Sequence, residues 1–263
     1  VVGYKPSYGL ISRSGVMRQS DKLDHIGVFG KTVEDVALFA KSLIKKDLYD
    51  PSTIHYAADE MLNVCKKGPI YEPKFIFYKT KNWKNIDKES QKSFDFFIKT
   101  FSKNIEVFDT PSYFDDIPKY HKIIHETDMA NNFQGYYKKS KKFLSKEMVS
   151  AIERGLKYSA KEYAEAIDFM KRSYESYKEV FEDFHGVLTP SSSGVAPKGL
   201  KSTGSPEFST IWTYMGLPSI SLPLLIGANN LPLGIQLVGD KLDDLRFLVV
   251  ANWLEKTCKK YAK

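Results

Sequence analysis

Cysteine is scarce in this sequence of 263 residues, which contains only Cys65 and Cys258. Two cysteines are too few for a disulfide framework, and their spacing fits no zinc-binding pattern. We therefore expect both to be reduced thiols, buried or half-buried. A reducing cytoplasm is the natural location for such a protein.

Arginine is also scarce, since lysine provides most of the 39 basic residues and of the net charge of +7. The densest cluster lies at 138–142. A basic surface can attract polyanions. However, proteins that grip phosphates and read bases usually combine arginine with aromatic side chains. We therefore expect a solvated, lysine-rich surface and no nucleic-acid partner.

Charge of either sign is absent from residues 208–239, a stretch long enough to span a bilayer. Glycine and proline interrupt the stretch at intervals that leave no helix of about 20 residues. Buried strands joined by turns explain it better. We interpret the segment as core and expect no membrane partner.

A signal peptide is missing from the start of the sequence, where no basic segment precedes an apolar one. The first residue is Val1 rather than methionine, and residues 1–3 are typical of the end of a strand. We expect an amino-terminal segment, with any targeting signal it carried, to lie outside this sequence.

Familiar catalytic motifs are absent, including Gly-x-Ser-x-Gly, the Walker loop, His-Glu-x-x-His and a Gly-x-Gly-x-x-Gly after a strand. His121 and His125 share a helix face but have no obvious third ligand, so we expect no metal. Serines 191–193 follow a buried strand, where α/β proteins place ligands. Only His185 is near them, before that strand, so we interpret them as turn formers.

Apolar periodicity predicts a strand, a helix and a second strand in the first half of the sequence. The strands cover 74–78 and 105–108, and a stripe of phenylalanines predicts a helix over 87–102 between them. This order indicates a crossover unit with parallel strands.

The same patterns predict most other elements. Helices are expected over 32–46, 159–184, 207–215 and 241–258, with 113–184 mostly helical; strands over 187–190, 219–224 and 233–238; and a loop over 191–206. Paired aspartates at 115–116 and 243–244 stand at helix starts, where we expect them to meet the positive end of the dipole. We expect one α/β domain over 1–263, with a mixed, largely parallel sheet flanked by helices.

Several segments resemble blocks of the amidase signature family and occur in the family's order. Near the amino terminus these are 2–12 (VGYKPSYGLIS), 23–27 (LDHIG) and 31–37 (KTVEDVA). Near the carboxyl terminus they are 188–190 (LTP), 202–204 (STG), 212–213 (WT), 216–223 (GLPSISLP) and 231–239 (LPLGIQLVG). The resemblance is weaker between 49 and 185, and it identifies the chain as the carboxy-terminal part of such a domain.

The resemblance implies an α/β/α fold and hydrolysis of a carboxamide by a Ser–cis-Ser–Lys triad, with no cofactor. One serine attacks the carbonyl, and the lysine moves the proton through the second serine. Backbone N–H groups hold the oxyanion. In the family the nucleophile precedes the segment that opens this chain, which places it roughly ten residues before Val1. We therefore expect no catalytic residue in this chain and expect its partner to be the amino-terminal half of the same polypeptide.

The sequence departs from the family's pattern at four positions. Val28 and Lys31 replace a usual proline and arginine, Lys22 stands where serine is common, and Ser205 where aspartate is frequent. A lysine lacks the planar fork of arginine, so the resemblance does not carry a bidentate contact over to position 31. These departures bear on the subfamily more than on membership.

The resemblance also implies that this half forms a wall of the substrate pocket. We expect Trp212, with its neighbours Thr210 and Met215, to line it. Three residues of the middle helical region are weaker candidates: Met129, Asn132 and Phe133. Asp24 is expected to order the turn after the catalytic segment without touching substrate. An ordinary core position for Trp212 is an equal alternative, and a Trp212→Ala change that altered substrate preference more than stability would favour the pocket.

Three functions remain open from the sequence. The first is a free-standing amidase acting on small or aryl amides, which the segments 202–204 and 212–213 favour. The second is the amidase subunit of a tRNA-dependent amidotransferase, which works inside a complex. The third is a truncated, inactive remnant. The substrate is expected to be a small-molecule amide, and a homo-oligomer is left open.

Overall fold

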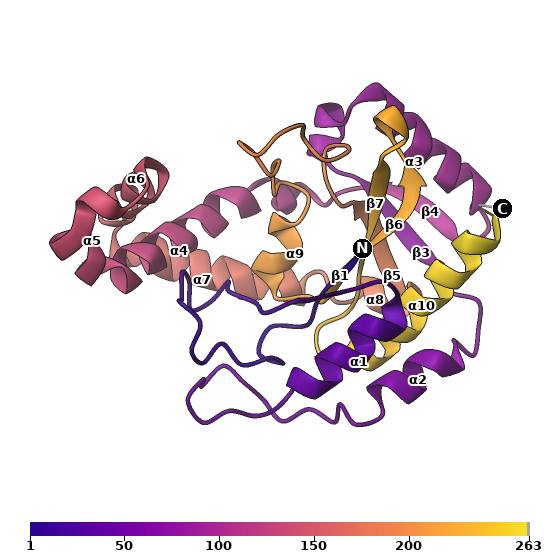
Figure 1. Ribbon diagram of the computed structural model, residues 1–263, viewed down its shortest axis with the longest axis horizontal. Coiled ribbons are helices and arrows are strands. Elements are labelled where there is room, and N and C mark those ends of the chain that lie inside the picture. The colour runs from indigo at the N-terminus through magenta and orange to yellow at the C-terminus, as the bar shows by residue number, and fades with distance from the viewer. Residues whose placement is uncertain (262–263) are drawn as a thin grey trace.

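The structure is a computed structural model that describes the backbone of residues 1–261 and the side chains of residues 1–260 (Figure 1). Within this range a seven-stranded sheet has the order β2-β1-β6-β7-β5-β3-β4, with helices on both faces. The strands are β1 (Val2–Lys5), β2 (Val28–Gly30), β3 (Phe75–Lys79), β4 (Ile105–Asp109), β5 (Gly186–Pro190), β6 (Ser219–Ile226) and β7 (Pro232–Val238). The mixed α/β architecture that the sequence predicts is therefore confirmed.

The helices follow the sequence patterns closely. The α-helices are α1 (Val33–Leu43), α2 (Met61–Lys67), α3 (Lys88–Thr100), α4 (Ile117–Asn132), α5 (Gln134–Ser140), α6 (Lys146–Gly155), α7 (Ala160–Glu175), α8 (Val180–Asp183), α9 (Thr210–Met215) and α10 (Asp244–Tyr261). Short 3-10 helices are η1 (Lys81–Asn85), η2 (Ser112–Asp115), η3 (Lys141–Phe143) and η4 (Ala228–Asn230). None of the helices described is long and apolar enough to cross a bilayer.

The predicted crossover unit is present, because β3 and β4 are parallel neighbours joined through α3. Parallel pairing is less extensive than expected. Among the described residues β3 pairs in parallel with β4 and β5, whereas the other neighbours in the sheet are antiparallel. The uncharged segment 208–239 supplies the antiparallel β6–β7 pair. A short connection, η4, joins these two strands, and such a hairpin needs no crossover helix.

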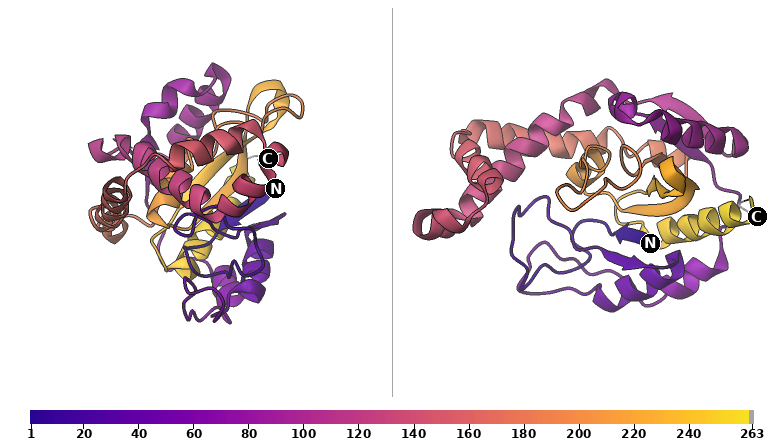
Figure 2. Two further views of the ribbon diagram at one scale, coloured as in Figure 1. Left: turned by 90° about the vertical axis from the view of Figure 1, so that its left-hand side faces the viewer. Right: turned by 45° about the horizontal axis from the view of Figure 1, so that its top comes forward.

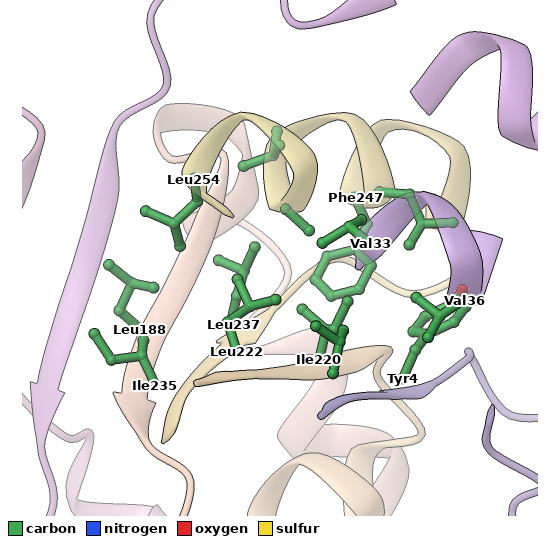
Figure 3. Packing of buried hydrophobic residues seen from close by; sticks show 14 of the residues in the cluster. Tyr4, Val33, Val36, Leu188, Ile220, Leu222, Ile235, Leu237, Phe247 and Leu254 are labelled. Atoms are coloured by element: carbon green, nitrogen blue, oxygen red, sulfur yellow. The ribbon is translucent and has the colours of Figure 1, made fainter. Parts of the chain in front are cut away.

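Successive residues of the central strands enter different cores, because strand side chains alternate between the two faces of a sheet. In β3, Phe75 and Phe77 join the core under α1, α2, α3 and α10, whereas Ile76 and Tyr78 join the core under α4, α7, α8 and α9. Figure 3 shows strand residues such as Leu237 meeting Phe247 of α10. Burial on both faces explains why these strands are continuously apolar.

Capping boxes begin the helices expected from residues 32 and 159. Thr32 and Asp35 form a capping box on α1, and Ser159 and Glu162 form another on α7. Both cysteines are buried and free, as predicted. Burial raises the pKa of each thiol to about 12, which keeps both protonated and unreactive near neutral pH.

Two local features differ from the sequence-based expectations. The helix expected over 159–184 is broken, since α7 ends at Glu175 and α8 begins at Val180. Its apolar stripe nevertheless faces inward, with Tyr177 and Phe181 buried. The three-residue strand β2 was not predicted, because it forms only by pairing with β1 over Val2–Tyr4. Such a short strand has no periodicity to detect.

A buried hydrogen-bond cluster ties the first strand to the last helix. The Asp244 carboxylate, fully buried at the start of α10, accepts hydrogen bonds from the Tyr4 hydroxyl, the Ser7 hydroxyl and the Ser7 backbone N–H. Ser7 Oγ also accepts from the Leu242 N–H at 2.8 Å. Burial raises the pKa of Asp244. The hydrogen bonds from Ser7 and Tyr4 lower this pKa and so partly offset the effect of burial. Asp244 thus does more than meet the helix dipole, because it joins segments 240 residues apart.

Replacing Asp244 with alanine in the full-length protein should lower the free energy of unfolding by about 3 kcal/mol or more, because buried donors of Tyr4 and Ser7 lose their acceptor. Asp243→Ala is the matched control. Asp243 is half-exposed and pairs with Arg246, so its loss should cost less than about 1 kcal/mol. Urea unfolding of both variants measures the difference, and equal losses would contradict the structural role of Asp244.

Candidate functional site

A hollow lies beyond the carboxyl end of β5, where the chain leaves the buried strand at Pro190. Its volume is about 430 Å³. Residues 192–197 form one side, residues 202–205 the other, and Pro232 and Gly234 of β7 contribute the sheet edge. Ligand sites of α/β sheets commonly lie at this end of the strands. The Ser202-Thr203-Gly204 segment, singled out in the sequence, is therefore part of a concave surface.

Ser191 directly precedes the residues that line this hollow and is held by the sheet. Its Oγ lies 2.8 Å from the Ser221 Oγ, and its N–H donates to the Gly234 carbonyl at 3.1 Å. A Cβ on Gly234 would come within 2.8 Å of both hydroxyls, so glycine is required for this close approach. The lining contains no histidine, lysine or carboxylate. This arrangement can hydrogen-bond a ligand but has no base to activate a serine.

Of serines 191–193, Ser192 has the contact of a turn residue, whereas the Ser191 hydroxyl bonds Ser221 of β6. Ser192 Oγ donates to the Gly194 carbonyl at 2.6 Å, a local turn bond. His185 lies at the opposite end of β5, where its N–H and its Nδ1 bond the backbone of Lys74. It is therefore too far along the strand to activate these serines.

Trp212 lies in the core rather than on a surface. It is 1% exposed and packs against Phe114 and Tyr177, with ring centroids 5.9 and 6.0 Å away. Its indole N–H is buried without a hydrogen-bond partner. The burial favours the core alternative for this residue. Thr210, at the start of the same helix, is half-buried and donates to the Pro206 carbonyl at 3.1 Å, next to the 202–205 segment.

Met215, at the end of α9, lines a different hollow of about 280 Å³ together with Tyr8, Tyr174 and Lys241. Gly216 follows it with a φ of +73°, a left-handed conformation that ends the helix. Lys241 Nζ lies 5.3 Å from the centre of the Tyr174 ring. Met215 is 2% exposed and belongs to the same buried cluster as Trp212, so both side chains are part of the core and Met215 also reaches the wall of this hollow.

Asp24 orders a turn, as the sequence suggests. Its carboxylate accepts from the backbone N–H groups of Gln19 and Ser20 at 2.7 and 3.1 Å. It also lines a hollow of about 330 Å³ with Lys5 and His25. These contacts agree with a turn-ordering residue, whereas its relation to a catalytic segment stays a prediction.

Helix α4 holds the same turn from the other side. Asn132 Nδ2 donates to the Gln19 carbonyl at 3.3 Å. Met129 and Phe133 are buried, and Phe133 belongs to a small separate core at the end of the helix. Of these three weaker candidates, Asn132 alone is half-exposed beside the turn. Their contact with substrate stays a prediction.

Lys5 and His25 were not singled out from the sequence. Lys5 donates to the Leu217 carbonyl, and burial lowers its pKa to about 7. His25 Nδ1 lies 2.7 Å from the Leu23 carbonyl and must therefore carry the proton. Burial lowers the pKa of His25 well below its usual value, so the ring is neutral at pH 7. The sequence offered one indication of this site, because Lys5 lies within the 2–12 segment that resembles the family.

A family model described as Amidase matches residues 1–248. The chain belongs to the amidase family. Curated relatives include the A subunit of glutamyl-tRNA(Gln) amidotransferase from Alkaliphilus metalliredigens, 28% identical over 97% of this chain and 59% of the relative. The corresponding protein of Mycoplasma genitalium is 25% identical over 97% of this chain and 62% of the relative.

Solved amidase-family structures show the same fold. The A subunit of glutamyl-tRNA(Gln) amidotransferase from Thermotoga maritima matches with a TM-score of 0.76 at 23% identity, over 97% of this chain and 57% of that one. A 6-aminohexanoate cyclic dimer hydrolase matches with a TM-score of 0.80 at 18% identity, over 100% and 61%. The chain thus spans about three fifths of the length of the relatives it matches.

Because Trp212 is enclosed by other rings, Trp212→Ala should lower the free energy of unfolding by about 3–5 kcal/mol through cavity formation. Thr210→Val on the same helix is the matched control and should cost less than about 1 kcal/mol. Denaturant unfolding of both full-length variants provides the comparison. A Trp212 variant of normal stability with altered substrate preference would instead show that the indole lines the pocket.

Proposed function

We propose that this chain is the scaffold and pocket half of an amidase that hydrolyses a carboxamide C–N bond, giving a carboxylate and ammonia or an amine. The catalytic Ser–cis-Ser–Lys residues would belong to sequence that precedes Val1. The chain would form one α/β domain together with that sequence. Membership of the amidase family and the composition of the hollow beyond β5, which contains polar groups but no base, support this division of roles.

The start of β1 is the observation that carries the proposal. In the β1–β6 pair Lys5 faces Ser219 and Gly3 faces Ser221, so the chain runs back from Lys5 towards Ser221. Ser221 in turn contacts Ser191, which directly precedes the residues that line the hollow. Residues that precede Val1 would therefore enter at this end of the sheet. A nucleophile roughly ten residues upstream is within reach, because an extended chain advances about 3.3 Å per residue.

Exposed apolar side chains around β2 and α1 mark the surface on which a preceding half would pack. Phe29 on the edge strand is 75% exposed, and Leu38 and Phe39 on α1 are 52% and 51% exposed. The strand β2 also has no neighbour on its outer side within the described sheet. An unpaired edge beside exposed apolar residues favours aggregation of the isolated chain.

The 263 residues alone should be poorly soluble and release no ammonia from carboxamides, because the proposed catalytic serines and lysine precede Val1. Extension by the upstream coding sequence, if it supplies a Gly-Gly-Ser segment, should restore both solubility and ammonia release. Replacing that upstream serine with alanine is the control and should abolish release again. Turnover by residues 1–263 alone would refute the proposal.

The biological setting of the activity has two candidates. The 202–204 and 212–213 segments favour a free amidase, whereas the curated relatives named above are subunits of an amidotransferase and favour the second candidate. An inactive remnant is the third alternative. It requires that no Gly-Gly-Ser precede Val1.

The two active settings differ in substrate and in assembly. An amidotransferase subunit should release ammonia from glutamine and retain partner proteins through size-exclusion chromatography at its native expression level. A free amidase should elute without partners and hydrolyse an aryl amide such as an acyl anilide faster than glutamine. Measuring both substrates on the same full-length preparation decides between them.

A further inference from the structure

The helical arm of the molecule projects away from the sheet. Helices α4 and α7 form its shaft, and α5, η3 and α6 form its end (Figures 1 and 2). The end has a small core of its own, in which Phe133 and Ile152 are buried against Leu144 and Met148. Ser145 caps α6 by accepting from the Met148 N–H at 3.1 Å. The arm therefore ends in a folded unit rather than a loose loop.

Positive charge is concentrated in residues 134–146, which run from the start of α5 to the first residue of α6 and are called the arm end below. These residues include five lysines and no aspartate or glutamate. Lys141 is paired with Glu153 at 2.8 Å. The other four are exposed and have no ion pair within the described residues. They are Lys138, Lys139, Lys142 and Lys146. The formal charge of residues 134–146 is thus +5, whereas that of the whole sequence is +7.

Aromatic side chains stand among these lysines. Phe143 is 79% exposed and Tyr136 is 54% exposed. Lys142 Nζ lies 5.0 Å from the centre of the Phe143 ring. An exposed phenylalanine surrounded by flexible lysines is the composition of protein segments that settle at a lipid–water interface.

The chemistry of the arm end favours a lipid surface over a nucleic acid. Single-strand binders track the backbone along a groove, whereas the arm end is a projection. Readers of RNA or DNA rely on arginine, and the arginine nearest in sequence to these lysines, Arg154, is paired with Glu126 at 2.6 Å. Lysines act as point charges that suit a flat layer of anionic headgroups.

We propose that the arm end, residues 134–146, binds the surface of a bilayer containing anionic lipids. The four unpaired lysines meet the headgroups, and Phe143 inserts between them. Since no described helix can cross a bilayer, this contact is peripheral. It revises the expectation of no membrane partner, which rested on the lack of a spanning segment. It is independent of the amidase proposal.

Vesicle co-sedimentation of the full-length protein tests the inference. Vesicles of phosphatidylcholine with about one third phosphatidylserine should bind the protein at 0.1 M salt, and pure phosphatidylcholine vesicles should not. The triple change K138E/K139E/K142E should weaken binding at least about a hundredfold, since each lysine near an anionic surface contributes about fivefold. Phe143→Ser should weaken it about tenfold.

The matched control is K45E/K66E/K67E, which changes the net charge equally after α1 and on α2, far from the arm. It should bind as the unaltered protein does. Thermal unfolding should be unchanged in the arm variants, which shows that they fold. Absence of binding to the anionic vesicles, or equal loss in the control, overturns the inference. Tighter binding of a single-stranded RNA 20-mer at the same salt overturns it as well.

Discussion

The buried carboxylate of Asp244 holds together parts of the chain that are otherwise far apart. It receives hydrogen bonds from Tyr4 and Ser7, which fix β1 and the turn after it against the start of α10. A carboxylate can stay buried only if donors surround it. Once these bonds form, β1 lies between β2 and β6, and α10 covers the core beneath β6 and β7. The location of the chain's first residues therefore depends on its last helix.

Because β1 is fixed in this way, its first residues lie at the same end of the sheet as the carboxyl end of β5. The start of β1, the Ser191–Ser221 contact and the 202–205 segment converge there from distant parts of the sequence. The Ser191–Ser221 contact and the 202–205 segment contribute hydroxyl groups, and the residues that line the hollow include no histidine, lysine or carboxylate. A concave, hydrogen-bonding surface without catalytic groups is what one would expect of a scaffold that completes a site. Family membership gives this geometry its chemical meaning.

The end of the helical arm has its own small core, separate from the two cores that flank the sheet. This end also has an excess of lysine, so it neither contributes to the main cores nor resembles the rest of the surface. Chains of this family share the sheet, and an arm that projects from it can change its surface chemistry at little cost to the fold. Binding at the arm end would therefore leave the hollow beyond β5 unaltered.

Local patterns in the sequence determined the elements of this protein. The capping boxes at Thr32 and Ser159, the β3-α3-β4 order and the burial of both cysteines follow from neighbouring residues, whose spacing fixes which side chains share a face. The 2–12 and 216–239 segments, taken in their order along the chain, were enough to indicate the family. Only the tertiary structure decided that Trp212 is enclosed, that β2 exists, and that Asp24 and Met215 lie in different hollows. Those outcomes depend on contacts between residues distant in sequence, and no local periodicity encodes them.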